Sequence, residues 1–371
     1  MVDFLSLATS GVRGLQPYQP GKPIEELERE YGVSNALKLA SNENPLGPSP
    51  LALEAARRAL SEVWLYPDGS GFRLKRKLAA RHGVPQEWIT LGNGSSDPLD
   101  FIVRVLVSPE NEVIFSAHSF ALYPILTQMA GAQAVVVPAR AWGCDLEAMA
   151  AAVTSKTAVV FIANPNNPTG TWLTGEALEG FIQSLPERVM VVIDEAYFEY
   201  ASHPDTGARG YPDTTQWVTR YPNLMVTRTF SKCYGLAGLR VGYAISRPEM
   251  AELMNRVRPP FNVGSVALAA AEAALDDGIH LRRSVESNAA GLKQLAAGFR
   301  RLGLEFIPSV GNFVCVDVGR PAGPVYEALL REGVIVRPVA NYGMPHHLRI
   351  TVGKSEHNDT IINALEKVLV R

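Results

Sequence analysis

Three polar segments of the sequence directly follow apolar runs of the kind that form buried strands. The run AVVFIA leads into Asn164–Gly170 (NPNNPTG), VMVVI ends at Asp194, and NLMVT leads into Thr229–Lys232 (TFSK). Ligands of a parallel sheet gather at the carboxyl ends of its strands, so an amide, a carboxylate and an amine would meet in one crevice. A lysine amine in such a place can act as a nucleophile or a base once it loses its proton.

Each of these segments also has an ordinary structural explanation. NPNNPTG consists of residues that are common in turns, Asp194 could cap the N-terminus of a helix, and Lys232 could be a solvated surface lysine. Their occurrence at successive strand ends of one predicted sheet favours a shared site. The residues alone leave both explanations open.

The stretch from Trp88 to Ile245 predicts the sheet that would carry these groups. It alternates helical segments with short apolar runs, namely WITLG, NEVIF, AVVV, AVVFIA, VMVVID, NLMVTRTF and VGYAIS. Nearly continuous Val and Ile runs are typical of strands that are buried on both faces. We therefore expect an α/β fold in which helices sandwich a mostly parallel, seven-stranded sheet.

The flanking segments predict helices and a smaller α+β domain. Helical spacing marks Leu51–Leu60 and Phe72–Arg81, and after the sheet an Ala-rich stretch (VALAAAEAALDD) and Ser284–Leu302 should lead away from it. The strand-like runs FVCVDV, VIVRPV and LRITVG and the helical VYEALLRE would form the smaller domain. The Pro, Gly and Asn content before about Asn44 predicts an irregular arm. We expect residues 1–44 to form this arm and part of the small domain, 45–262 the large domain, and 263–371 the small C-terminal domain.

The composition indicates a globular protein whose partners are small molecules. Of the 371 residues, 47% are hydrophobic and 19% are charged, which excludes overall disorder. A net charge of −2 without a long basic run offers nothing to bind a nucleic-acid backbone. Three scattered cysteines suit neither a disulfide framework nor a zinc site, so we expect the reducing cytoplasm. We expect neither export nor membrane insertion, because no signal peptide and no membrane-length apolar run is recognisable.

The ordered motifs NPNNPTG, DEAY, TFSK and GLRVGY resemble those of the fold-type I pyridoxal-phosphate-dependent aminotransferases over nearly the whole chain. Four further segments are similar to the histidinol-phosphate aminotransferases within that family. They are Leu39–Pro48 (LASNENPLGP), Tyr66–Asp68 (YPD), Gly92–Ser95 (GNGS) and Leu348–Gly353 (LRITVG). Each motif is weak alone, but the ordered set is specific. The resemblance implies an aminotransferase that uses pyridoxal 5'-phosphate, with residues 45–262 as its cofactor-binding domain.

The resemblance assigns a role to each polar group of the predicted crevice. Lys232 would hold the cofactor aldehyde as a Schiff base and later move the substrate proton as base and then acid, which requires an amine with a lowered pKa. Asp194 would pair with the protonated ring nitrogen of the cofactor. Asn167 and Tyr197 would hydrogen-bond its phenolic oxygen, although Tyr197 could also be an ordinary core tyrosine.

The cofactor phosphate requires a group of hydrogen-bond donors. Gly94, Ser95 and Ser96 precede an apolar stretch (DPLDFIVRVLV), which predicts a turn that opens a helix, and the N–H groups of a helix N-terminus bind anions. The resemblance adds the hydroxyls and the guanidinium of three residues after the strand, Thr229, Ser231 and Arg240. Arg240 could instead form a surface ion pair.

Two positions depart from the family pattern. The family usually has an acidic or amide residue at the position of Ser96 and often a tyrosine at the position of Phe120. A backbone donor survives any side chain, and a phenylalanine ring can still stack on the cofactor. We expect structural rather than catalytic roles for Cys233, His118, His346 and His347, and no spacing of these residues makes a metal site.

Two arginines near strand ends of the predicted small domain, Arg337 and Arg349, suit the planar recognition of carboxylate or phosphate, although both could be surface bases. By resemblance, Arg349 would bind the carboxylate of glutamate and the phosphate of histidinol phosphate in turn, and Arg337, Tyr18 and Asn42 would assist. The resemblance thus implies amino transfer between L-histidinol phosphate and 2-oxoglutarate, which gives imidazole-acetol phosphate and L-glutamate in histidine biosynthesis.

Tyr66 matches a family tyrosine that reaches the cofactor phosphate of the neighbouring subunit, which implies a homodimer with shared sites. Tyr66 could also be a turn residue before Pro67 and Asp68. Aromatic amino acid aminotransferases share every cofactor motif and remain an alternative, as does a related phosphothreonine decarboxylase. A cofactor-binding regulatory protein would carry a basic DNA-binding domain, for which no segment is left over.

Overall fold

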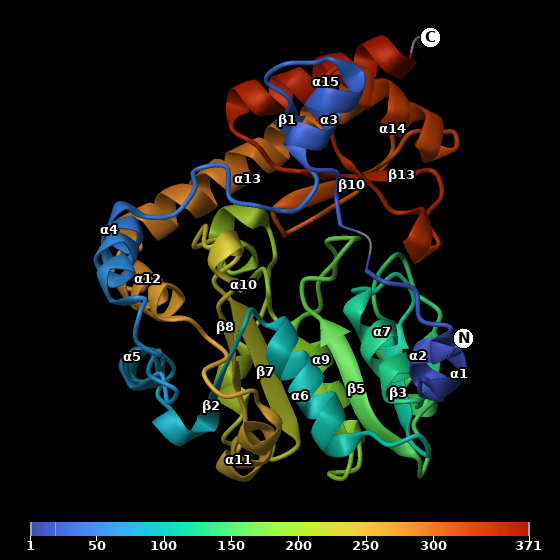
Figure 1. The fold of residues 1–371 in the computed structure, drawn as a ribbon. Coiled ribbons are helices and arrows are strands. Elements are labelled where there is room, and N and C mark those ends of the chain that lie inside the picture. Colours follow the sequence, from blue (N-terminus) through green and yellow to red (C-terminus); the bar gives the residue numbers. More distant parts are fainter. Residues whose placement is uncertain (1, 19, 370–371) are drawn as a thin grey trace.

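A seven-stranded sheet forms the lower body of the molecule in Figure 1. The structure is a computed structural model, and it describes residues 2–18 and 20–369. Five strands pair in parallel, and β8 runs antiparallel to both of its neighbours. The order across the sheet is β2 (Ile89–Gly92), β8 (Gly242–Ile245), β7 (Leu224–Thr229), β6 (Met190–Asp194), β5 (Thr157–Ala163), β3 (Glu112–Ser116) and β4 (Gln133–Val137). The predicted mostly parallel sheet is confirmed.

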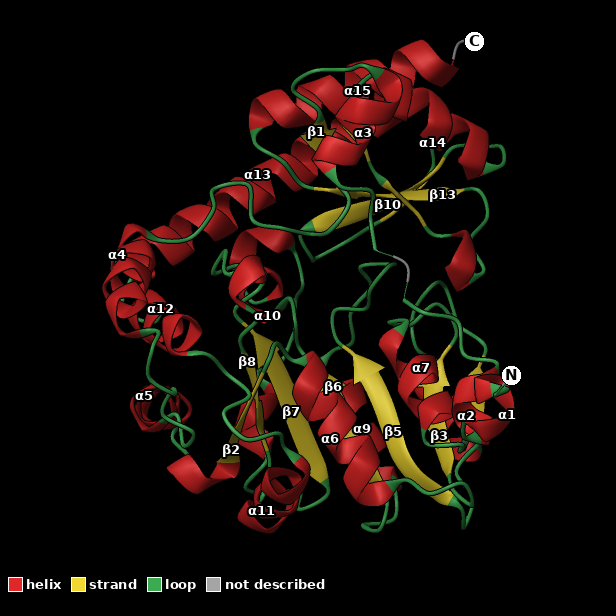
Figure 2. Cartoon of the chain, viewed as in Figure 1, coloured by secondary structure: helices red, strands yellow, loops and turns green. Residues whose placement is uncertain are grey.

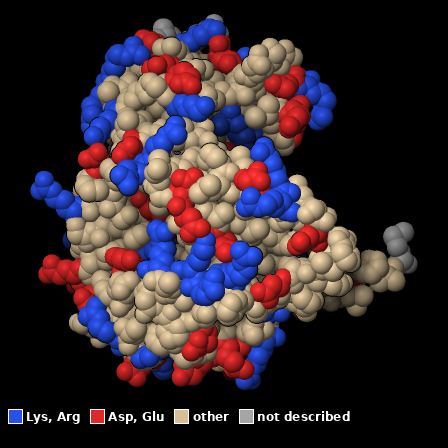
Figure 3. All heavy atoms as spheres, turned by 90° about the vertical axis from the view of Figure 1, so that its left-hand side faces the viewer, with Lys and Arg blue, Asp and Glu red and all other residues tan. Residues whose placement is uncertain are grey.

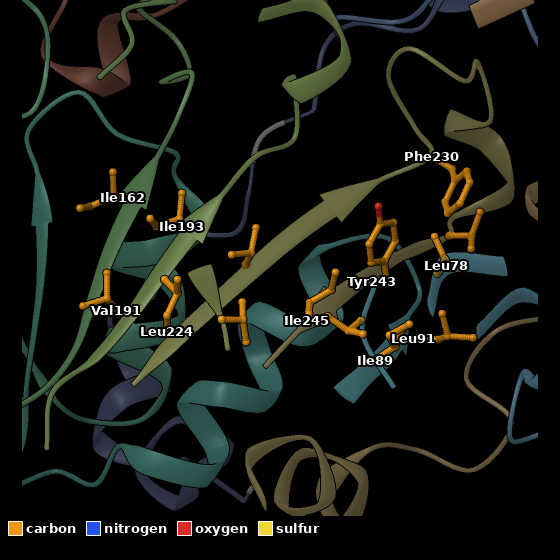
Figure 4. Packing of buried hydrophobic residues seen from close by; sticks show 14 of the residues in the cluster. Leu78, Ile89, Leu91, Ile162, Val191, Ile193, Leu224, Phe230, Tyr243 and Ile245 are labelled. Atoms are coloured by element: carbon orange, nitrogen blue, oxygen red, sulfur yellow. The ribbon is translucent and has the colours of Figure 1, made fainter. Parts of the chain in front are cut away.

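Both faces of this sheet are covered by apolar side chains. Because side chains alternate along a strand, Val191 and Ile193 of β6 pack on one face and Val192 on the other. Figure 4 shows the first of these clusters, in which Leu224 of β7 lies beside Val191 of β6. Each fully buried aliphatic side chain contributes roughly 1.5–3 kcal/mol. The core therefore fixes the carboxyl ends of β5, β6 and β7.

Helices flank the sheet, as Figure 2 shows. Ser49 caps α4 (Pro50–Ala59) because its Oγ accepts a hydrogen bond of 3.1 Å from the N–H of Ala52, and α5 (Phe72–His82) ends at the left-handed Gly83. Both helices were predicted and are confirmed. The others of this body are α6 (Ser96–Leu106), α7 (Leu122–Met129), α8 (Leu146–Ala151), α9 (Gly175–Ser184), α10 (Phe198–Ala201) and α11 (Pro248–Val257). No helix in residues 2–18 or 20–369 is both long and apolar enough to cross a membrane.

The Ala-rich segment does not lead away from the sheet, contrary to our expectation. It forms α12 (Ser265–Ala274), whose Ala267 and Ala271 belong to the same core as Ala52 of α4. Small side chains allow these two helices to pack closely. The 24-residue α13 (Gly278–Arg301) is the helix that leads to the upper body.

The upper body is the predicted α+β unit. Its antiparallel sheet has the order β12 (Arg337–Pro338), β13 (His347–Thr351), β10 (Phe313–Asp317) and β9 (Phe306–Ile307). One face of this sheet packs against α13, α14 (Ala322–Arg331) and α15 (Ser355–Leu369) through a second apolar core. The other face is directed toward the lower body (Figure 1).

The N-terminal arm touches both bodies. The short α1 (Phe4–Leu7) and α2 (Ser10–Arg13) lie beside the lower sheet, where α2 contacts α7. The arm is not irregular throughout, because residues between Pro23 and the left-handed Gly32 form α3 (Ile24–Tyr31), whose Leu27 is buried. After it, β1 (Leu37–Lys38) pairs in parallel with β11 (Val334–Ile335) of the upper body. The domain boundaries at residues 44 and 262 stay a prediction.

Candidate active site

A cavity lies between the two bodies at the carboxyl ends of β5, β6 and β7. Every residue predicted for the site lines it except Gly94 and Tyr66. The predicted lining residues are Tyr18, Asn42, Ser95, Ser96, Phe120, Asn167, Asp194, Tyr197, Thr229, Ser231, Lys232, Arg240, Arg337 and Arg349. The sheet thus brings together groups that lie more than 300 residues apart in the sequence.

Asp194 is the last residue of β6, and its side chain is held by two hydroxyls. Its Oδ1 accepts a hydrogen bond of 2.9 Å from Thr227 of β7, and its Oδ2 accepts one of 3.1 Å from the phenol of Tyr123. Burial raises the pKa of Asp194, whereas these two hydrogen bonds and the charge of Lys232 lower it. A buried carboxylate held in this way suits a cationic partner, and its two hydroxyl contacts do not support the helix-cap explanation.

Lys232 follows β7, next to the fully buried Phe230. Its Nζ donates a hydrogen bond of 3.2 Å to the carbonyl of Ser41 and lies 5.8 Å from the centre of the Tyr197 ring. Burial, and next the positive charge of Arg349, lowers the pKa of Lys232 to about 8. The amine therefore loses its proton far more readily than an ordinary lysine, as a nucleophile or general base requires. It is not a solvated surface lysine.

Tyr197 lines the cavity, and its phenol group is hydrogen-bonded. The phenol oxygen accepts a hydrogen bond of 2.9 Å from Nδ2 of Asn42. Burial raises the pKa of Tyr197 to about 12, so the phenol keeps its proton and can donate a hydrogen bond to a ligand. Asn42 itself has a left-handed backbone with a φ of 56°, which is uncommon outside glycine.

Arg349 of β13 enters the cavity from the upper body. Its Nη1 donates to Oδ1 of Asn167 at 2.6 Å, and its Nη2 donates to the carbonyl of Ala40 at 2.7 Å. Its Nε is buried and has no hydrogen-bond partner among the described residues. The guanidinium of Arg337 lies over the ring of Tyr18, at 5.7 Å from its centre. Two cations thus face the cavity on this side, and an unpaired buried donor favours an incoming anion.

A third group of donors lines the same cavity. Ser95 and Ser96 stand at the N-terminus of α6, where free N–H groups favour an anion. Arg240 donates from Nη1 to Oγ of Ser231 at 3.1 Å, and no acidic residue within the described residues forms an ion pair with it. Gly94 lies directly against this arginine, since a Cβ at Gly94 would stand 2.4 Å from the Nη2 of Arg240.

The donor set fits pyridoxal 5'-phosphate. An amine with a lowered pKa matches its aldehyde, the buried Asp194 matches its ring nitrogen, and the α6 N-terminus with Arg240 matches its phosphate. Phe120 lines the same cavity, and its ring meets that of Tyr123 edge to face at 5.8 Å. Which residue performs which role stays a proposal. No cluster of His, Cys, Asp or Glu that could hold a metal ion occurs in the described part of the chain.

Tyr66 lies outside this cavity. Its side chain is 82% exposed and stacks on Phe261 with ring centres 4.8 Å apart. The sequence interpretation missed Tyr123 and Thr227, which hold Asp194. Thr227 had a detectable signal, because it stands two residues before Thr229 on the same strand, whereas the contact of Tyr123 depends on how α7 packs.

Known proteins resemble this chain over its full length. A model of the family described as aminotransferase class I and II matches residues 34–365. Histidinol-phosphate aminotransferase 1 of Nitrosococcus oceani is 61% identical over 366 residues, which cover 99% of this chain and 98% of that protein. Histidinol-phosphate aminotransferase 2 of Pseudomonas aeruginosa is 58% identical over 371 residues, which cover 100% of this chain and 99% of that protein.

Solved structures agree with the fold. The histidinol-phosphate aminotransferase from Sinorhizobium meliloti, in complex with pyridoxal-5'-phosphate, has a TM-score of 0.89 at 32% identity and covers 98% of both chains. An aspartate aminotransferase from Thermus thermophilus with maleate is 22% identical with a TM-score of 0.83, over 97% of this chain and 99% of that one. At that identity the second likeness concerns the fold alone.

Proposed function

The chain belongs to the class I and II aminotransferase family, and on this basis we propose that it transfers the amino group between L-histidinol phosphate and 2-oxoglutarate, giving imidazole-acetol phosphate and L-glutamate. The reaction is a step of L-histidine biosynthesis. The observation that carries the assignment is Arg349, which presents a buried, unpartnered Nε in the cavity that Lys232 lines. A guanidinium in this place suits the carboxylate of glutamate as well as the phosphate of histidinol phosphate.

Bound pyridoxal 5'-phosphate would supply an electron sink for the negative charge that develops on the substrate carbon. Lys232 would hold the cofactor through its Nζ, and the same amine would move a proton from the substrate carbon to the carbon derived from the cofactor aldehyde, as base and then as acid. Asp194 would hold the protonated ring nitrogen, since its carboxylate is buried and already oriented by Thr227 and Tyr123. Tyr197 and Asn167 would hydrogen-bond the phenolic oxygen of the ring.

Both substrates would use the same pocket in turn, because the amino group stays in the site when the first, oxo product leaves and passes only then to the second substrate. Arg349 and Arg337 offer guanidinium groups that suit either anion, and Tyr18 of the N-terminal arm lies against Arg337. These roles of the cavity residues are part of the proposal.

A comparison of amino donors tests the substrate. We expect histidinol phosphate to react with a kcat/KM at least about 100-fold above that of phenylalanine or tyrosine. This factor is the order of magnitude of one paired guanidinium–phosphate contact, which the aromatic amino acids cannot make. The reaction is followed through the absorbance of the cofactor. Brisk turnover of aromatic amino acids with no reaction of histidinol phosphate would favour an aromatic aminotransferase. Release of carbon dioxide without a keto acid would identify a decarboxylase.

We further propose a homodimer that works in the cytoplasm. Figure 3 shows the side of the molecule on which α4, α5 and α12 lie, where uncharged surface lies between groups of charged side chains. Large apolar side chains are exposed around it in a single chain, namely Leu60, Val63, Trp64, Leu65, Tyr66, Phe72 and Phe261. Patches of this kind usually mark a protein interface. The three unpaired cysteines suit a reducing compartment.

Mixed dimers test whether Tyr66 acts across the interface. Chains with Tyr66→Ala and chains with Lys232→Ala would each be weak or inactive alone. A mixed dimer would regain one complete site, formed by Lys232 of the first chain and Tyr66 of the second, so activity should appear on mixing. Absence of any gain in mixed dimers, confirmed by light scattering, would reject the shared site.

A further inference from the structure

The hairpin after β4 has an unfavourable sequence for its shape. Arg140 and Gly143 exchange two backbone hydrogen bonds of 2.9 and 3.0 Å, so the turn between them has only two residues. Both are left-handed, with φ values of 48° at Ala141 and 64° at Trp142. Such turns favour Asn-Gly, because side chains with a Cβ are strained in this conformation. Strain of this kind persists where it serves a purpose.

The ring of Trp142 reaches from the lower body to the upper one. Its centre lies 5.4 Å from that of the His118 imidazole and 5.1 Å from that of the His347 imidazole. His118 follows β3 of the large sheet, whereas His347 is the first residue of β13. His118 also has a left-handed backbone, with a φ of 57°, and its Nδ1 donates to the carbonyl of Tyr342 in the upper body at 2.5 Å.

The same hairpin is tied to the loop Asn164–Gly170 at the cofactor side. The carbonyl of Trp142 accepts a hydrogen bond of 3.3 Å from Oγ1 of Thr171, which lies 3.0 Å from Oγ1 of Thr169. Asn166 donates from Nδ2 to that Thr169 hydroxyl at 2.8 Å and to the carbonyl of His118 at 2.9 Å. The loop is therefore held between Trp142 and His118.

Two contacts join β13 to the lower body at neighbouring places, one from the loop Asn164–Gly170 and one from the hairpin that is tied to this loop. Asn167 in the loop accepts the hydrogen bond from Arg349, and Arg349 stands two residues after His347 on β13. Trp142 contacts His347, which lies on the same strand as Arg349 and two residues before it. His347 is only 7% exposed and Trp142 is 39% exposed, so the indole covers a buried imidazole from outside.

We propose that Trp142, His118 and His347 form an interdomain clamp that fixes Arg349 relative to Asn167, and so sets the affinity of the site for the anionic group of its substrates. The three are positioning residues, since none of them lines the cavity. The proposal rests on the proposed function, in which Arg349 binds the substrate anion. It assigns a role to the indole at a left-handed turn position.

The test replaces the two turn residues by the pair that the turn favours, Ala141→Asn with Trp142→Gly. The backbone is relieved of strain while the ring is lost, so the melting temperature should not fall. In the single-turnover reaction of the holoenzyme with glutamate, we expect the half-saturating concentration to rise about tenfold, the order of one or two lost aromatic pairs, with the maximal rate unchanged. Trp142→Phe keeps a ring and should remain near the unmodified protein.

A binding measurement without chemistry accompanies the kinetics. Succinate, a dicarboxylate that cannot react, is titrated into the holoenzyme by calorimetry, and its dissociation constant should rise by a similar factor in the double variant. Unchanged succinate and glutamate affinities would overturn the clamp. A lower melting temperature with loss of bound cofactor would also overturn it, because the ring would then be structural. If the unmodified protein does not react with glutamate, the proposed function fails, and the succinate titration still decides the clamp.

Discussion

Nη1 of Arg349 donates a hydrogen bond of 2.6 Å to Oδ1 of Asn167 across the boundary between the two bodies. Arg349 belongs to the short antiparallel sheet, and Asn167 belongs to the loop that follows β5. The residue proposed to bind the substrate anion therefore contacts a residue proposed to orient the cofactor. Substrate affinity and cofactor orientation should be coupled through this pair.

Arg349→Lys tests the anion site. We expect KM for glutamate and for histidinol phosphate to rise by similar factors of about 100, because an ammonium cannot form the planar paired hydrogen bonds of a guanidinium. Steady-state kinetics with both substrates is the measurement, and Arg331→Lys on the exposed side of α14 is the matched control. A loss confined to one substrate would show that the two anions bind at different places.

Lys232→Ala tests the cofactor anchor. The variant should keep its circular dichroism spectrum but yield no cofactor adduct after borohydride reduction and mass spectrometry, since no amine remains at the end of β7. Lys354→Ala, at an exposed lysine, should give the full adduct. An adduct that persists in Lys232→Ala would point to another lysine.

The lowered pKa of Lys232, about 8, predicts how capture of the cofactor depends on pH. Only the uncharged amine attacks an aldehyde, so the rate of capture by the cofactor-free protein should rise with pH and level off above about 8 rather than above 10.5. Arg349→Gln removes a positive charge that disfavours the ammonium ion, which should shift this midpoint upward. Stopped-flow absorbance measures both profiles. A midpoint near 10 in the unmodified protein contradicts the burial argument.

The hydroxyls that hold Asp194 should matter for the rate. Tyr123→Phe and Thr227→Val each remove a hydrogen bond that lowers the pKa of Asp194, and we expect kcat to fall about three- to tenfold in each, from roughly 1 kcal/mol per bond. Asp194→Asn should be much more damaging. Tyr221→Phe, which loses a hydroxyl bonded to Glu179 away from the cavity, serves as the control. Equal rates in Tyr123→Phe and the control would remove Tyr123 from the site.

Gly94→Ala should weaken the binding of the cofactor phosphate. The new Cβ would stand 2.4 Å from Nη2 of Arg240, and the φ of 77° strains any side chain there. We expect the dissociation constant of pyridoxal 5'-phosphate to rise at least about tenfold, since a displaced guanidinium loses a charge-assisted hydrogen bond. Gly238→Ala, where a Cβ meets nothing within 4 Å, is the control. Equal affinity in both variants would mean that Arg240 is free to move.

The strand ends of the site were predictable from the sequence. Continuous apolar runs place Asp194 at the end of β6 and Lys232 after β7, and parallel pairing brings those ends to one edge. A glycine and two serines before an apolar run predicted the turn that opens α6, and the anion site there stays a prediction. These predictions depend only on local pattern and on one general rule about sheets.

The remaining contacts depend on tertiary geometry. Tyr123 reaches Asp194 because α7 packs over β5, where its ring stacks on Phe161 at 4.7 Å, and no periodicity encodes that distance. Trp142 and His118 act through left-handed backbone in loops, which the residue types there do not suggest. The arm helix α3 was missed because the surrounding Pro and Gly suggested loop, although they stand at the ends of the helix.

The pairing of Leu37 with Val334 has a consequence for synthesis on the ribosome. All strands of the large sheet lie between Ile89 and Ile245, so this sheet can assemble while the last third of the chain is still being made. The residues near position 37 must wait for their partner until nearly the whole polypeptide has emerged. During that interval the nascent chain would expose apolar surface around Leu27 and Leu39, which makes this segment a natural contact for a chaperone.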